Sequence, residues 1–457
     1  MKKTITLLSI LTFAFALNAQ ELDTKAISDI QSSFEMDAYT KAMQNALSNN
    51  DINDLAKNLE NIGEDDHFFT YRVDVKGITN QKSSGRCWLF TSLNMFRPKA
   101  MEVFNVNEFE FSENYLYFWD LFEKSNLFLN NIIETVDAPI DDRLVQWYLA
   151  SPVSDGGMWS SFANLVDKYG MIPKEAMTET HSSENTRYMV KFINLKLKED
   201  GIRLRQAAAA GANSKALQAQ REEMMKEIYR MLALNLGVPP NEFTWRYEDV
   251  DNTLSASETY TPLEFKEKVM GDIQASDYVM LMNDPTRPFG VHYEIDNYRN
   301  VEEGVNWHYV NLSNDKIKAM AIESIKNNEA IYASCDVGQQ LDRSYGILDV
   351  DNFDYDAVYG VKFGMNKSER IQSKASGSSH GMALIAVDLD ENGKSTKWQF
   401  ENSWGVDAGH NGYLTFTDEW FDEFMFRIVV HKSFVTPEVL KIYETKATLL
   451  PAWDWMF

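Results

Sequence analysis

An amide and a thiol lie six residues apart, at Gln81 and Cys87, just before a segment that predicts a helix. Residues 88–96 are apolar on nearly every side, which is typical of a helix buried inside a domain. At the first turn of such a helix, unpaired backbone amides and the helix dipole favour the thiolate, the reactive form of cysteine. Cys87 is therefore a candidate nucleophile, although a cysteine beside apolar residues can equally be a small filler of the core.

A candidate base and a candidate partner for that base lie far downstream, at His380 and Asn402. Residues 378–387 form an apolar run after a Gly/Ser loop, and residues 398–405 place alternate side chains on one face, so both segments are predicted strands. Residues 390–394 between them have the composition of a hairpin turn. Pairing of the two strands would bring His380 beside Asn402.

Together these residues could carry nucleophilic catalysis at a carbonyl carbon. A thiol needs a base that takes its proton and returns it later, and the base needs a third group that fixes its tautomer. Cys87, His380 and Asn402 match these three needs. Gln81 could donate its side-chain amide to the oxyanion, together with the Cys87 backbone amide. Trp404 could shield the bond between the histidine and the asparagine from water.

The sequence resembles the papain-like cysteine peptidases, and within them the bleomycin hydrolase or aminopeptidase C branch. The motifs that carry the resemblance are NQKSSGRCWLF at 80–90, DGGMW at 155–159, KYGMIPK at 168–174, CDVG at 335–338, SHGM at 379–382, ENSWG at 401–405 and LPAWD at 450–454. The resemblance implies an α+β, two-lobed fold, with Cys87 in a helical left lobe and His380 and Asn402 in an antiparallel β right lobe. It also implies that Cys87 is the nucleophile, His380 the base, Asn402 its orienter and Gln81 the oxyanion donor.

The end of the chain departs from the pattern of that branch. There, the resemblance implies, the last residues lie along the cleft and their terminal carboxylate meets the free amino group of the substrate. This chain has the bulky residues Trp455, Met456 and Phe457 there. We expect an aminopeptidase that releases N-terminal residues through a Cys87 thioester. An endopeptidase or a peptide acyltransferase with the same residues is the alternative, and a non-catalytic peptide-binding scaffold is a more remote one.

The first 19 residues have the features of a cleavable secretory signal. Lys2 and Lys3 precede an apolar stretch from Ile5 to Leu17, and a small residue, Ala19, ends the segment. The stretch is too short to span a bilayer comfortably, and an uncleaved anchor is the alternative. We therefore expect an exported protein, periplasmic or secreted, with no membrane contact after cleavage.

The chain contains two cysteines, Cys87 and Cys335. In an oxidising compartment two cysteines suggest one disulfide. The family resemblance instead places Cys335 in a structural loop, which favours two free thiols; Ser84 stands where many papain relatives carry a disulfide cysteine. No CxxC pair is present, so we expect no metal and no cofactor.

Composition is globular along the whole 457-residue chain, and no Pro/Ser-rich linker divides it, so we expect one scaffold with insertions. The predicted parts are an N-terminal arm at 20–70, the left lobe at 71–187, a helical insertion at 188–275, the right lobe at 276–440 and a C-terminal tail at 441–457. Strong helix formers at 207–210 and 217–236 support the insertion, and Pro239 and Pro240 are predicted to end its helices.

Charge restricts the choice of partners. A formal net charge of -24 argues against binding to nucleic acid, which requires a basic surface. We expect peptides as substrates. Members of the family assemble as hexamers whose sites face an inner chamber, so the resemblance also implies a homohexamer.

Three further motifs have more ordinary interpretations. A G-x-S-x-G match places Ser379 where esterases have a nucleophile, but a strand-like run follows where that elbow requires a helix. Residues 349–356 resemble a calcium loop, but Phe353 occupies a ligand position and the required glycine is missing. His292 and His308 lie in aromatic, strand-like contexts without metal-ligand spacing, so we expect structural roles for both.

Overall fold

The computed structural model describes residues 22–61 and 66–456. The predicted signal at 1–19 and the terminal Phe457 lie outside the described residues. The chain divides into a small compact unit, Met1–Lys57 with Asp354–Lys362, and a large one, Asn58–Phe353 with Phe363–Phe457.

The small unit consists of short helices that begin at aspartate caps. They are α1 (Thr24–Ser32), α2 (Ala38–Leu47), α3 (Ile52–Ala56) and α13 (Tyr355–Tyr359). In each, an Asp carboxylate at the N-cap accepts from a backbone amide of the first turn, which satisfies a donor that the helix leaves unpaired. Tyr355 Oη donates to Asn53 Oδ1 at 2.6 Å and ties α13 to α3. The N-terminal part of this unit ends at Lys57, and the arm boundary at residue 70 stays a prediction.

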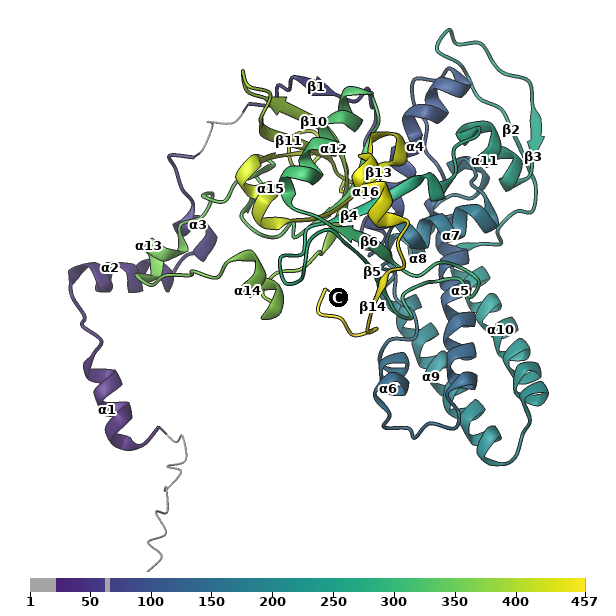
Figure 1. The fold of residues 1–457 in the computed structure, drawn as a ribbon, viewed down its shortest axis with the longest axis horizontal. Helices are drawn as coiled ribbons and strands as arrows, with labels where there is room; N and C mark the ends of the chain where they lie inside the picture. Colours follow the sequence, from purple (N-terminus) through teal and green to yellow (C-terminus); the bar gives the residue numbers. More distant parts are fainter. Residues whose placement is uncertain (1–21, 62–65, 457) are drawn as a thin grey trace, which may run out of the picture. The chain divides into compact units, whose positions relative to one another are not determined.

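A mixed sheet forms the centre of the large unit (Figure 1). Its described strands are β1 (Tyr71–Arg72), β4 (Tyr278–Met282), β5 (Val291–Ile295), β6 (His308–Asn311), β7 (Ile331–Cys335), β8 (Leu341–Asp342), β9 (Ile347–Leu348), β10 (His380–Leu389), β11 (Ser395–Glu401), β12 (Tyr413–Thr417), β13 (Met425–His431) and β14 (Thr448–Leu450). They run in the order β14-β5-β6-β4-β13-β7-β10-β11-β12-β9-β8, with β1 on β10. The central pairs are antiparallel, as expected for the right lobe, whereas β4–β6, β5–β14 and β9–β12 are parallel.

Helices cover this sheet and form the second lobe. They are α4 (Cys87–Phe104), α5 (Glu113–Glu134), α6 (Arg143–Ala150), α7 (Trp159–Tyr169), α8 (His181–Glu184), α9 (Arg187–Ala209), α10 (Ser214–Leu236), α11 (Pro262–Met270), α12 (Asn314–Lys326), α14 (Lys367–Gln372), α15 (Asp418–Phe424) and α16 (Pro437–Tyr443). A separate hairpin pairs β2 (Phe243–Trp245) with β3 (Glu258–Tyr260). Within the described residues, no helix is both long and apolar enough to cross a membrane.

Helix α4 connects the two lobes because it packs against both β10 and the helices α7 and α11. It begins at Cys87, and its first three turns are buried almost completely, as the apolar run at 88–96 predicts. It continues through Pro98 and ends where Asn105 adopts the left-handed conformation (φ 52°), a common way to terminate a helix.

The predicted helical insertion contains two long helices, α9 and α10, which pack against each other and lie beside α5 in Figure 1. Their contact faces are apolar and buried at helical spacing, for example Leu217, Ile228 and Leu232 of α10. Gly237, with φ 91°, follows α10 directly, so the helix ends before the two prolines that were expected to stop it.

A buried ion pair fastens α4 to β11. Arg97 Nη2 lies 2.7 Å from Glu401 Oε1 and 2.8 Å from the carbonyl oxygen of Gly77. Both charged side chains are almost fully buried. Burial raises the pKa of Glu401 to about 7, although the neighbouring Arg97 opposes this shift. Since Glu401 directly precedes Asn402, this pair fixes the end of β11 next to the functional site.

We predict that Arg97→Met lowers the free energy of unfolding by about 3 kcal/mol, because it leaves the Glu401 carboxylate buried without its cation. The double variant Arg97→Met/Glu401→Met should recover most of this loss, since an apolar pair leaves no charge to compensate. Denaturant titrations of wild type, both single variants and the double variant measure the coupling. Additive losses would contradict the prediction.

Candidate active site

Three sequence-distant elements bring Cys87, His380 and Asn402 together. Cys87 is the first residue of α4, His380 is the first residue of β10, and Asn402 directly follows β11. The antiparallel pairing of β10 with β11 places His380 Nε2 2.8 Å from Asn402 Oδ1. Because α4 packs on β10, the thiol of Cys87 reaches the other side of the same imidazole.

The thiol and the imidazole stabilise each other's charged form. Burial by itself raises the pKa of the Cys87 thiol, but the charge and hydrogen bond of His380 and the backbone amides of Gly381 and Trp88 outweigh it, so the pKa is lowered. Burial likewise disfavours the charged imidazole, yet Cys87 and the bond to Asn402 raise the pKa of His380. The site therefore favours a thiolate paired with an imidazolium.

The asparagine fixes how the imidazole presents its nitrogens. Since Nε2 faces an amide oxygen, Nε2 carries a proton and Nδ1 is directed to the thiol. Asn402 is 1 % exposed, and its Oδ1 also accepts from the Ser403 backbone amide at 2.8 Å. The Trp404 ring lies 4.8 Å from the His380 ring, centroid to centroid, where it covers the imidazole. Trp404 thus lies beside the hydrogen bond that we predict it shields from water.

Gln81 borders the same cavity as Cys87, and its amide orientation is fixed. Its Oε1 accepts from Ser403 Oγ at 2.7 Å, and its Nε2 donates to the carbonyl oxygen of Ser84 at 2.6 Å. An amide nitrogen has two hydrogens, so one remains for an oxyanion. The arrangement can provide the electrostatic stabilisation that an attacked carbonyl requires.

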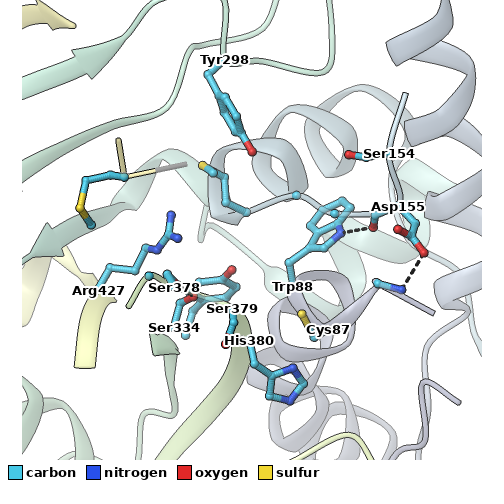
Figure 2. Close-up of a pocket in the computed structure, with 18 of the residues that line it drawn as sticks. Cys87, Trp88, Ser154, Asp155, Tyr298, Ser334, Ser378, Ser379, His380 and Arg427 are labelled. Carbon is cyan, nitrogen blue, oxygen red and sulfur yellow. Dashed lines mark hydrogen bonds between the residues drawn. The ribbon is translucent and has the colours of Figure 1, made fainter. Parts of the chain in front are cut away.

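A cavity of about 600 Å³ opens in front of Cys87 (Figure 2). One wall is the loop of residues 154–157, where Trp88 Nε1 donates to the carbonyl oxygen of Asp155 at 2.9 Å. Figure 2 shows Tyr298 and Arg427 on other sides of this space. The cavity can hold several atoms of a peptide on either side of the thiolate, and both polar and apolar side chains border it.

The chain's own C-terminal residues also border this cavity. Trp455 and Met456 are among the residues that line it. The segment is held by Asp454, whose two oxygens each lie 3.0 Å from Arg287 Nη2, and by Trp455 Nε1, which donates to Thr286 Oγ1 at 3.1 Å. The cleft is therefore bounded on this side by Trp455 and Met456; Phe457, the predicted cleft residue, is outside the described residues.

The second cysteine lies differently from what the resemblance implied. Cys335 is the last residue of β7, not part of a loop, and its Cα is in register with His380 on the neighbouring strand. Both Cys335 and Cys87 are free. Burial raises the pKa of the Cys335 thiol well above its usual range, so this cysteine is unreactive where Cys87 is activated.

The structure places the three other motifs in turns and strands. Ser379 is followed at once by strand β10, so no nucleophile elbow forms. In the acidic segment, Asp349 Oδ1 accepts from the Asp351 amide at 2.8 Å, as in a turn. His292 Nε2 lies 3.1 Å from His308 Nδ1, and both rings pack against the ring of Tyr443. No group of three or more His, Cys, Asp or Glu suited to a metal occurs in the part of the chain that the structure describes.

Sequence reasoning missed Arg427, a charged residue of the cavity wall. It lies in the otherwise apolar run of β13, and its side chain is buried. A single arginine within a buried strand is a signal that could have been found, because such residues are almost never fully buried without a partner. What the sequence could not show is that this strand borders the same cavity as Cys87.

The fold and the Cys-His-Asn arrangement are those of a papain-like cysteine peptidase. The chain belongs to the Peptidase C1-like family, whose model matches residues 21–457. It is 39 % identical over 449 residues to bleomycin hydrolase of Mus musculus, covering 96 % of this chain and 98 % of that protein. It is 38 % identical to aminopeptidase C of Streptococcus thermophilus, covering 95 % and 98 %. The crystal structure of PepW from Lactobacillus rhamnosis superposes with a TM-score of 0.92 at 36 % identity, covering 96 % and 99 %. The resemblance that the motifs indicated is thereby confirmed.

We predict that Gly157→Ala impairs the site far more than Gly156→Ala. A Cβ at Gly157 would lie 2.6 Å from the Trp88 ring, whereas at Gly156 the nearest atom, Ser154 Oγ, is 3.9 Å away. The clash would displace Trp88 and the start of α4, and a small displacement of reacting groups can lower kcat/KM by about 10- to 100-fold. Steady-state kinetics on both variants measures this difference. Equal losses would contradict the role of the close approach.

Proposed function

We propose that this protein is a cysteine aminopeptidase that hydrolyses peptides from their free amino end. One observation carries the proposal: the Cys87 and His380 pair opens into a cavity that the chain's own C-terminal residues border on one side. A cleft restricted in this way favours a short segment on one side of the scissile bond. Similarity to proteins named aminopeptidase C and bleomycin hydrolase supports the same activity.

In the first half of the reaction, the Cys87 thiolate attacks the carbonyl carbon of the scissile peptide bond. The Cys87 backbone amide and the Gln81 side-chain amide donate to the resulting oxyanion. When the tetrahedral intermediate collapses, the carbon–nitrogen bond breaks and the His380 imidazolium gives its proton to the leaving amine. A thioester on Cys87 and a neutral imidazole remain.

In the second half, the neutral imidazole of His380 takes a proton from water, and the hydroxide that forms attacks the thioester carbonyl. Cleavage of the carbon–sulfur bond releases the carboxylic acid and restores the thiolate and the imidazolium. Asn402 keeps the imidazole in one orientation during both proton transfers, and Trp404 limits the access of water to that bond.

An endopeptidase or an acyltransferase would use the same residues. An endopeptidase would cleave peptides without a free amino group next to the cleaved bond, and an acyltransferase would pass the acyl group of the thioester to an amine instead of water. The bulky residues Trp455 and Met456, which line the cavity beside Cys87, are the feature that favours this second candidate. Cleavage of amino-blocked substrates would distinguish an endopeptidase, and aminolysis products an acyltransferase.

We predict that the wild type hydrolyses an aminoacyl amide but not the same compound acetylated at its amino group. Cys87→Ala should lose all turnover and keep its fold, and alkylation of the thiol should have the same effect. Cys335→Ala serves as the matched control and should remain active and sensitive to alkylation. Fluorogenic amides measure these rates. Cleavage of the acetylated compound would refute the aminopeptidase, and turnover by Cys87→Ala would refute the nucleophile.

We further propose that the protein is exported after removal of residues 1–19 and assembles as a homohexamer. The proposal of export is based on the composition of this segment, and that of the hexamer on the family resemblance. Mass spectrometry of the protein from the extracytoplasmic fraction should give an N-terminus at Gln20. Sedimentation should give six times the mature mass; a monomer at micromolar concentration would refute the assembly.

A further inference from the structure

A buried arginine on the wall of the active-site cavity has no part in the reaction described above. Arg427 lies on β13, between β4 and β7, in register with Met282 and Ser334. Its side chain is 6 % exposed and borders the same cavity as Cys87. Figure 2 shows its guanidinium directed into the cavity rather than along the strand.

The guanidinium forms no ion pair with a carboxylate of the described residues, and the negative group that acts on it across the cavity is the Cys87 thiolate. Its Nε and Nη1 are buried without a hydrogen-bond acceptor there. The carboxylate that borders the cavity, Asp155, is already engaged, since its Oδ2 accepts from the Gly85 amide at 2.7 Å and from Thr186 Oγ1 at 2.5 Å. The exposed Lys374 also borders the cavity, so the cations there are not balanced by a free carboxylate of the described chain.

The other buried arginines and lysines of the described chain each have a carboxylate or other protein oxygen as a direct partner. Arg86 forms two hydrogen bonds with Glu179, and Arg97 pairs with Glu401. The buried lysines also have partners: Lys266 pairs with Asp167, Lys318 pairs with Asp418, and Lys367 donates to an amide oxygen and two carbonyl oxygens. Arg427 differs from all of these because its open side faces the cavity.

Keeping such a charge buried is unfavourable. Burial lowers the pKa of Arg427, yet a guanidinium stays protonated in proteins, so the charge persists. The Trp307 ring, 4.4 Å from the guanidinium carbon, stabilises the cation and holds its plane but does not neutralise it. An arginine held in this way is pre-organised for an anion that enters from the cavity.

We propose that Arg427 binds a carboxylate of the substrate, so that the enzyme prefers peptides with an Asp or Glu side chain next to the scissile bond. The inference rests on the proposed peptidase function. A planar guanidinium matches a carboxylate with two parallel hydrogen bonds, and a charge-assisted pair in a cavity removed from water is stronger than one at the surface. The hydroxyls of Ser334 and Ser378 lie near this position in Figure 2 and hydrogen-bond to each other, so one hydroxyl hydrogen of the pair remains for the same group.

The preference would oppose the long-range electrostatics of the protein. A net charge of -24 repels acidic peptides at a distance, so selection for them must come from a local group. Salt would screen the general repulsion more than the short, buried contact with Arg427. The preference should therefore persist at high ionic strength.

The test compares otherwise identical fluorogenic substrates that contain Glu or Gln, first in aminoacyl amides and then at each position of dipeptidyl and tripeptidyl amides. The wild type should favour Glu over Gln at one position by about 10- to 100-fold in kcat/KM, the range of charge-assisted hydrogen bonds. Arg427→Gln should bring this ratio close to one, and Arg427→Glu should favour a Lys substrate instead. Arg203→Gln, an exposed arginine of α9 outside the cavity, is the matched control and should keep the Glu preference.

Three results would overturn the proposal. One is a wild type that hydrolyses neutral substrates well and shows no Glu preference at any position. Another is a preference that survives in Arg427→Gln. The third is a preference that arises only after the last residues of the chain are deleted, which would mean that the tail and not the substrate neutralises Arg427. If no substrate at all is hydrolysed, the peptidase proposal fails instead. Binding of the same Glu and Gln peptides to Cys87→Ala then still decides the role of Arg427.

Discussion

The charge pair between Cys87 and His380 is the interaction on which the rest of this structure depends. Burial opposes both charges, so the pair exists only because each member stabilises the other and because Asn402 and backbone amides add to it. The thiol of Cys87 lies at the first residue of helix α4, and the β10–β11 hairpin positions the imidazole of His380 next to Asn402. The buried pair of Arg97 and Glu401 fastens these two elements to each other next to the site.

Two groups on the walls of the cleft in front of that pair affect which peptides can bind there. On one side the C-terminal segment, held by Arg287 and Asp454, occupies part of the space. On another, Arg427 presents a buried cation whose Nε and Nη1 have no hydrogen-bond acceptor among the described residues. The first feature restricts the length of chain that can pass the thiolate, and the second restricts its chemistry. Both act through groups that make no bond to the reacting carbonyl.

Local sequence patterns predicted the parts of the site that local structure determines. The apolar run after Cys87 indicated the buried helix, and the turn composition at 390–394 indicated the hairpin that joins His380 to Asn402. Features that arise from pairing between distant segments were not predictable in this way. They include Cys335 at a strand end beside His380, the association of Asp354–Lys362 with the first helices, and Arg427 facing the cavity. Periodicity gives the face of a strand on which a residue lies but not what covers that face.

The most direct measurement of the central claim is the ultraviolet absorbance of the thiolate as a function of pH, in wild type and in His380→Ala, with Cys87→Ser as the blank. The pKa of Cys87 is lowered and that of His380 is raised, so the ion pair should be present at pH values between these two pKa values. Wild type should therefore show thiolate already at mildly acidic pH, and His380→Ala should show it only at or above the ordinary cysteine pKa of about 8.5, because burial then acts without the imidazolium. A wild-type thiolate that appears only in that alkaline range would contradict the account.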